Sequence, residues 1–77
     1  MSDSRYADIG SPETKAIEEC AELIYILCKA DRFGWNCYHP ADPTQKKNWK
    51  LALDEIQDVR SALNVLEHHL LTMETAP

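Results

Sequence analysis

Residues 49–73 read WKLALDEIQDVRSALNVLEHHLLTM, and this stretch decides the fold class. Its apolar side chains recur at alternating intervals of three and four residues: Trp49, Ala52, Ile56, Val59, Leu63, Leu66, Leu70 and Met73. This spacing places them along one face of an α-helix and is typical of helices that pack in coiled-coil-like bundles. Asp42 can cap such a helix, Pro43 suits its first position and Gln45 can reach back to the cap. We therefore predict a long helix from about 43 to 73.

A first helix is predicted over about 12–31. Ser11 can cap it, Pro12 lacks an N–H that would be unpaired there anyway, and Glu13 meets the positive end of the helix dipole. Its apolar positions form a stripe at helical spacing: Ile17, Cys20, Ala21, Ile24 and Cys28. Residues 23–28 are apolar on every side, so one companion helix cannot cover them. The aromatic connector at 32–42 is expected to fold back onto the helices, because exposed rings are costly in water.

The chain of 77 residues allows one small helical domain, predicted over 11–73, with a flexible arm at 1–10 and a frayed tail at 74–77. A domain of this size buries little surface and needs a further source of stability. Its three cysteines, Cys20, Cys28 and Cys37, are an odd number and include no CxxC pair, which argues against a set of disulfides. Cys37 and His39 supply too few ligands for a zinc site. We therefore expect an all-α hairpin of two long helices that associates into a four-helix bundle, as a dimer or a tetramer.

Charge and hydropathy exclude several classes of protein. Eight Lys and Arg against thirteen Asp and Glu give a net charge of −5, which argues against a general nucleic-acid binder. No apolar run approaches the ~20 residues that span a bilayer, and the first residues do not resemble a signal peptide. No Ser/His/Asp arrangement or glycine-rich phosphate loop is present, so nucleophilic catalysis is not expected. The sequence predicts a soluble, cytoplasmic protein, in the host cytoplasm if it is encoded by a phage.

Two pairs of acidic residues do not fit a purely structural helix. Glu19 and Glu22 lie three residues apart on the first helix, and Glu55 and Asp58 repeat that spacing on the second. None of the four is followed by Lys or Arg four residues later, and in an antiparallel hairpin the two pairs come to similar depths. Converging carboxylates need a counter-charge, and ligands made only of oxygen suit Mg²⁺ or Mn²⁺, usually shared with a phosphate group. The alternative interpretation is that both pairs are ordinary solvated helix faces.

These residues resemble a family signature. Glu18-Glu19-x-x-Glu22 and Glu55-x-x-Asp58 are similar to the EExxE…ExxD pattern of the MazG-like all-α nucleoside triphosphate pyrophosphohydrolases. The resemblance covers residues 12–70, and the connector is similar to that of small phage-type members. It implies a bundle built by subunit association that hydrolyses (d)NTPs to the monophosphate and pyrophosphate. It also implies that Glu19, Glu22, Glu55 and Asp58 hold Mg²⁺, with Glu18 supporting them or orienting the attacking water.

Cations and rings near the carboxylates are the candidates for substrate binding. Lys29, Arg32 and Lys50 could clamp phosphate, with Lys46, Lys47 and Arg60 as further candidates. Trp35, Tyr38 and Trp49 could stack on a nucleobase, while Asn36 or Asn48 reads its edge. Core packing is the competing interpretation for Trp49, because it begins the apolar face of the second helix.

Two other classes of function stay open. A protein of the same build could capture a nucleotide or a cyclic-nucleotide signal without turnover. A small helical module could instead present its acidic face to a basic partner. An assay for pyrophosphate release from dNTPs with Mg²⁺ separates the enzyme from both.

Overall fold

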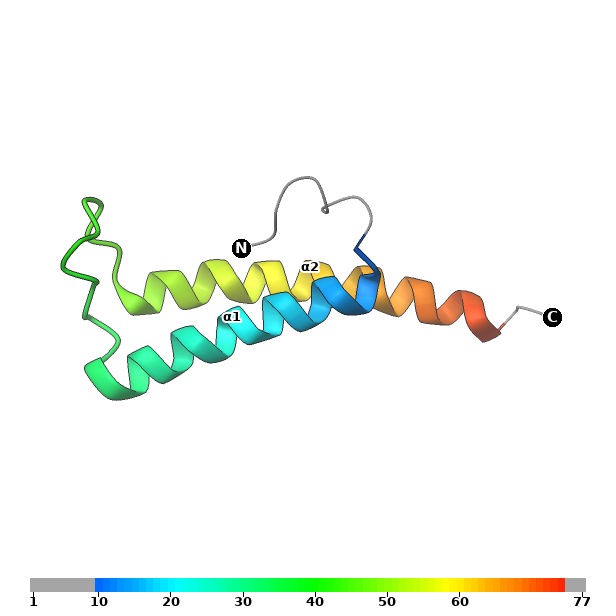
Figure 1. The fold of residues 1–77 in the computed structure, drawn as a ribbon, viewed down its shortest axis with the longest axis horizontal. Helices are drawn as coiled ribbons and strands as arrows, with labels where there is room; N and C mark the ends of the chain where they lie inside the picture. The colour runs from blue at the N-terminus through cyan, green and yellow to red at the C-terminus, as the bar shows by residue number, and fades with distance from the viewer. Residues whose placement is uncertain (1–9, 75–77) are drawn as a thin grey trace.

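Residues 10–74 of the computed structural model form an antiparallel pair of helices joined by an irregular connector (Figure 1). Helix α1 spans Pro12–Phe33 and helix α2 spans Asn48–Glu74. No strand is present in the described residues, so the predicted all-α class is confirmed. Residues 1–9 of the arm predicted over 1–10, and residues 75–77 of the tail predicted over 74–77, lie outside the described residues, whereas Glu74 belongs to α2.

Helix α1 begins as its sequence predicts. Ser11 is extended at the cap position, and its hydroxyl oxygen accepts the N–H of Thr14 at 3.1 Å. Pro12 occupies the first turn. The helix runs to Phe33 and ends because Gly34 adopts φ 98°, a backbone conformation that favours glycine. The Gly34 N–H still closes the last turn by donating to the carbonyl of Ala30 at 2.7 Å.

Helix α2 begins at Asn48, so the predicted start near Pro43 is wrong. Asp42 does accept backbone hydrogen bonds, but it receives them from Thr44 and Lys46 and so closes a local turn instead of capping a helix. Gln45 then takes φ 52°, in the left-handed region, which ends any helical path. The connector therefore covers 34–47, in place of the predicted 32–42.

The connector is attached to the first residues of α2 by backbone hydrogen bonds. The N–H of Asn48 donates to the carbonyl of Cys37 at 2.8 Å, and the N–H of Trp49 donates to the carbonyl of Trp35 at 3.0 Å. Tyr38 and Lys47 form an isolated antiparallel bridge. The connector thus folds back as expected, and these bonds satisfy N–H groups at the start of α2 that no helical carbonyl can reach. The rings of Trp35 and Tyr38 nevertheless remain exposed.

The two helices meet through a seam of mostly short side chains. The buried residues are Ala16, Glu19 and Ala30 on α1, with Asn48, Ala52, Glu55, Val59 and Ala62 on α2. The buried positions of α2 are separated by alternating intervals of three and four residues. Those of α1 follow the same spacing once the half-buried Leu23 and Ile26 are included. This spacing is typical of helices that pack side by side in a left-handed pair. The predicted seam is only partly correct. Ala52 and Val59 are buried, whereas Trp49 and Leu63 are 45% and 46% exposed.

The large apolar side chains lie on an adjacent face of the hairpin. We define the apolar face by six exposed residues: Ile17, Ile24, Leu27, Trp49, Leu53 and Leu63. In each helix they are rotated from the seam in the same sense, by roughly 60° to 140° at 100° per residue. Because the helices are antiparallel, this rotation brings both stripes to one side of the hairpin. Ile17 and Ile24 of the predicted α1 stripe are therefore exposed instead of buried in the seam.

The hairpin is one helix layer thick. Its shortest dimension is 16 Å, little more than the 10–12 Å diameter of one helix with its side chains. A single layer cannot enclose side chains on both of its sides. Among the described residues, neither helix combines the length and apolar character that crossing a bilayer requires.

Candidate functional site

Three carboxyl groups converge between α1 and the first half of α2. Glu19 comes from α1, and Glu55 and Asp58 come from consecutive turns of α2. One oxygen from each of the three lies within 4.8 Å of the others. We call these three residues the acidic group. The spacing of three on α2 and the antiparallel register bring them together, as the sequence predicts.

Two members of the acidic group are buried and incompletely hydrogen-bonded. Glu19 is 8% exposed and Glu55 is 7% exposed, whereas Asp58 is exposed at the rim. Oε2 of Glu19 and Oε1 of Glu55 find no hydrogen-bond partner among residues 10–74. An unpaired carboxyl oxygen taken out of water costs free energy that ordinary core residues do not incur. Packing between the helices therefore does not by itself explain why two glutamates occupy this seam.

The acidic group holds one ionised and one protonated buried carboxyl near neutral pH. The pKa of Glu19 is held below the ordinary value by a hydrogen bond with Glu55 and by the nearby Lys15. The Nζ atom of Lys15 lies 2.9 Å from Oε1 of Glu19. Burial raises the pKa of Glu55 to about 8, helped by the hydrogen bond to Glu19 and by nearby negative charges. Ionising both of these neighbouring carboxyl groups costs electrostatic free energy, so without a counter-ion Glu55 keeps its proton to a higher pH.

The donor set fits a hard divalent cation. All of its ligand atoms are carboxylate oxygens, which Mg²⁺ and Mn²⁺ prefer over softer donors. The two orphaned oxygens are the atoms that a cation would satisfy. A divalent ion would also supply the positive charge that lets both buried carboxyls ionise together. The residues present therefore fit such an ion.

The structure does not place Glu22 within the acidic group. Glu22 lies on the next turn of α1 and is exposed, although its charge contributes to raising the pKa of Glu55. Glu18 is half-buried on the neighbouring position of α1. The roles predicted for Glu22 as a ligand and Glu18 as a water-orienting residue therefore remain predictions.

An open groove gives access to the acidic group. Its lining includes Pro12, Lys15, Ser61 and Val65 beside Glu19 and Asp58. Lys15, Glu22 and Asp58 are rotated from the seam in the sense opposite to the apolar face. The carboxylates thus open on the polar side of the hairpin.

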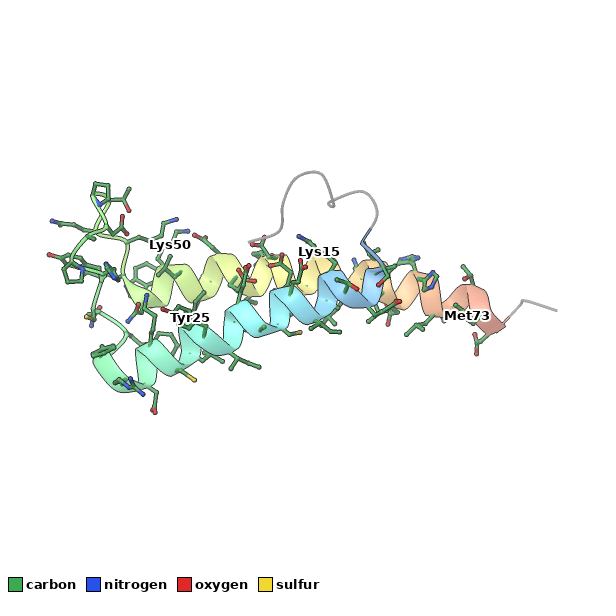
Figure 2. All side chains as sticks on the ribbon, in the orientation of Figure 1. Lys15, Tyr25, Lys50 and Met73 are labelled. Atoms are coloured by element: carbon green, nitrogen blue, oxygen red, sulfur yellow. The ribbon has the colours of Figure 1, made fainter. Side chains whose placement is uncertain are left out.

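A second hollow lies at the connector end of the hairpin, with a volume of about 480 Å³. We call it the connector cleft. It is lined by Tyr25, Lys29, Phe33, Cys37, Tyr38, His39, Pro40 and Asn48. Lys29 Nζ lies 5.6 Å from the centroid of the Tyr25 ring, so it adds positive charge to a largely aromatic wall. Tyr25 and Lys50 lie in the half of the hairpin near the connector, and Lys15 lies toward the other end (Figure 2).

The predicted substrate-binding residues divide into two sets. Lys29 and Tyr38 line the connector cleft, whereas Arg32, Trp35 and Asn36 are exposed outside its lining. Lys50 is engaged elsewhere, because its Nζ lies 3.1 Å from Asp54 Oδ1 and Lys46 contacts the other oxygen of Asp54.

Sequence reasoning missed Lys15 as the cation beside Glu19. The prediction considered only basic residues four positions after each acidic residue, whereas Lys15 stands four positions before Glu19. Helical spacing works in both directions, so this pair could have been found.

Comparison with known proteins gives no match: no protein-family model, no curated protein and no solved structure matches this chain. The function must therefore be argued from the acidic group and the connector cleft themselves.

Proposed function

We propose that this protein is a Mg²⁺-dependent nucleotide pyrophosphohydrolase that cleaves (d)NTPs to (d)NMP and pyrophosphate. The observation that carries the proposal is the acidic group, in which one buried oxygen of Glu19 and one of Glu55 lack partners and the three carboxyl groups come within 4.8 Å of one another. The resemblance of these same positions to the MazG-like signature supports this choice of chemistry over other uses of a divalent ion.

Glu19, Glu55 and Asp58 are the residues that would hold Mg²⁺ or Mn²⁺, and Glu22 on the next turn of α1 would complete the set. When bound, such an ion neutralises phosphate charge and makes a bound water more acidic. The chain itself supplies a low-dielectric seam in which these charges act strongly. Glu18, beside Glu19 on α1, is the candidate to orient the water that attacks the α-phosphorus as pyrophosphate leaves.

The connector cleft supplies the rest of a nucleotide site. Asn48 stands seven residues before Glu55 on α2, roughly 10 Å along the helix axis. A base in the cleft could therefore extend its sugar and phosphates along the polar side toward the acidic group. Lys29 and Tyr38 contribute charge and a stacking surface there, while Arg32, Trp35, Asn36 and Lys50 are candidates from the cleft's surroundings.

The catalytic unit is proposed to be a homo-oligomer, a dimer or a tetramer. The apolar face leaves Ile17 67% exposed and Ile24 61% exposed, and the corresponding stripe of α2 lies beside them. A face of this kind in a layer one helix thick is self-complementary, because a second hairpin presents the same stripes. Pairing two such faces would form a four-helix bundle and leave both acidic groups on the outside.

The decisive experiment measures pyrophosphate release from each dNTP with Mg²⁺. We expect turnover that Glu55→Gln and Asp58→Asn each reduce at least about 100-fold, as loss of a charge-stabilising group in an active site does. Glu67→Gln makes the same chemical change on the exposed last turns of α2 and should retain full activity. Failure of the wild-type protein to release pyrophosphate from any dNTP or NTP would contradict the enzymatic proposal.

The alternative proposal is a nucleotide or cyclic-nucleotide binding protein without turnover. One observation favours it: among the described residues, the lining of the connector cleft has several rings and a lysine but no carboxylate, so the cleft could hold a ligand independently of the acidic group. Tight binding of a nucleotide with no product release would favour this alternative. Indifference to both nucleotides and Mg²⁺ would leave an acidic interaction module.

A further inference from the structure

Asn48 is the most deeply buried polar side chain of the described residues, at 2% exposed. Its backbone N–H donates to the carbonyl of Cys37 at 2.8 Å, and its side-chain Nδ2 donates to the carbonyl of Gly34 at 3.0 Å. Its Oδ1 finds no hydrogen-bond donor in the part of the chain that the structure describes. A buried amide oxygen without a donor is costly, so Asn48 does more than fasten the connector.

The orientation of the Asn48 amide is determined by its surroundings. Exchanging its oxygen and nitrogen would set Oδ1 against the carbonyl oxygen of Gly34, two acceptors face to face. This orientation leaves Oδ1 as the atom of the amide without a partner, while Nδ2 already donates one N–H to Gly34. The carbonyl oxygens of Gly34 and Cys37, which accept from Asn48, are acceptors too, so the polar groups next to Oδ1 favour an N–H donor over a carbonyl oxygen.

Asn48 belongs to the wall of the connector cleft. The same wall carries the rings of Tyr25, Phe33 and Tyr38, against which a flat heteroaromatic ring can stack. Lys29 adds a donor and a positive charge, suited to a ring nitrogen or a phosphate. The cleft thus combines stacking surfaces with one unsatisfied acceptor and one cation.

We propose that the connector cleft binds a nucleobase through an exocyclic amino group, of the kind that adenine and cytosine carry, which donates to Asn48 Oδ1. The proposal rests on the proposed function in taking a nucleotide as the ligand. It adds a selection rule. Bases that replace the amino group by a carbonyl oxygen, as hypoxanthine and uracil do, bring an acceptor to an acceptor and are disfavoured.

Two matched pairs of ligands test this rule without any hydrolysis. The full-length protein in EDTA is titrated with AMP and IMP, and with CMP and UMP, and the dissociation constants are measured by calorimetry. We expect the amino-bearing member of at least one pair to bind at least about tenfold more tightly. Equal affinities within both pairs, tighter binding of IMP and UMP, or no binding of any of the four would overturn the proposal.

Two variants separate the Asn48 contact from stacking. Asn48→Ala should bring the affinity ratio within the preferred pair to about one, whereas Asn64→Ala, an exposed asparagine of α2, should leave it unchanged. Because Asn48→Ala could also loosen the connector, Tyr38→Leu provides a second readout. It should weaken both members of the preferred pair equally and preserve their ratio, and an unchanged affinity would contradict placement of the base in this cleft.

These outcomes are independent of turnover. Amino-selective binding in EDTA with no pyrophosphate release would support the cleft and refute the enzyme. Pyrophosphate release with no preference within either pair would support the enzyme and refute the amino-reading role of Asn48.

Discussion

The buried pair Glu19 and Glu55 occupies positions where a helical hairpin would ordinarily place leucine or alanine. Glu55 sits between Ala52 and Val59 in the seam, so its carboxyl group is surrounded by apolar neighbours and by Glu19. A hydrocarbon side chain there would pack without any electrostatic cost. The pair therefore lowers stability in the absence of a cation, which is common for groups retained for function.

The free energy of unfolding should depend on pH through Glu55. Its pKa is about 8 in the folded chain against 4.5 for an unperturbed glutamate, so the folded state binds the extra proton between these values. Stability in EDTA should therefore fall as pH rises from about 5 to 8, with a slope of at most about 1.4 kcal/mol per pH unit. Urea unfolding at several pH values measures it.

The control for this pH dependence is Glu55→Gln, which removes the titrating group and keeps the side-chain shape. The variant should be more stable than the wild type at pH 8 and should lose most of the slope between pH 5 and 8. The carboxyl of Glu19, whose pKa is lowered, contributes stability that is lost only as pH falls below 4.5. A slope that persists unchanged in Glu55→Gln would contradict the assignment to this residue.

Mg²⁺ should reverse the destabilisation caused by the acidic group. A ligand that binds only the folded state at 100 times its dissociation constant adds about 2.7 kcal/mol. We therefore expect Mg²⁺ or Mn²⁺ to raise the Tm of the wild-type protein at pH 8, and to do so much less for Asp58→Asn. An equal rise for both proteins would indicate nonspecific screening of the net charge.

The residues of the acidic group were predictable from spacing, because i, i+3 positions share a helix face wherever the helix packs. The exclusion of Glu22 was not predictable. Which of two acids on neighbouring turns enters the seam depends on the rotation of α1 about its axis, and in the structure this rotation buries Ala16 and Ala30 together with Glu19. The charged residues of α1 alone do not specify it.

Among the structural elements, the connector is the one whose boundaries the sequence predicted least accurately. Asp42-Pro43-Thr44-Gln45 has the composition of a helix start, and its local hydrogen bonds do form, but around a turn. The helix begins at Asn48 because the connector carbonyls of Trp35 and Cys37 accept the N–H groups there. These partners are distant in sequence from any capping motif, so local patterns could not reveal them.

Gly34 should be the most sensitive residue of the connector. Its φ of 98° and ψ of 157° lie in a region that only glycine occupies readily, although a Cβ there would meet no atom within 4 Å. Gly34→Ala should therefore lower the free energy of unfolding by about 1–3 kcal/mol through backbone strain alone. Asn36→Ala, at an exposed connector position, should change it by less than about 0.5 kcal/mol. Urea titrations of the two variants make the comparison, and equal stabilities would refute the strain.

For the whole molecule, the central fact is that the hairpin buries four alanines in its seam and leaves many of its large apolar side chains exposed. The alternating pattern of residues 49–73 correctly predicts a helix and a packed face. It cannot say whether that face meets α1 or another chain, because both partners would require the same periodicity. In the structure the alanines meet α1, and Trp49, Leu53 and Leu63 remain exposed on the apolar face.

Assembly should therefore depend on the apolar face. Leu53 is 50% exposed there, and Leu53→Lys should shift the mass in light scattering from the oligomer toward the monomer. Val65 is 59% exposed on the polar side, so Val65→Lys adds the same charge outside the proposed contact and should leave the mass unaltered. A monomeric wild type, or equal sensitivity of the two variants, would contradict assembly through this face.

Helix α2 runs on past the first residue of α1 (Figure 1), and every residue from Glu67 to Glu74 is exposed. A lone helical segment this short melts readily in water, since isolated helices below ~12–15 residues are marginal. Deuterium uptake by the amides of these final turns is therefore a sensitive measure of contact with another subunit. Slow uptake at high protein concentration that becomes fast on dilution would reveal that a neighbouring subunit holds this projecting end in place.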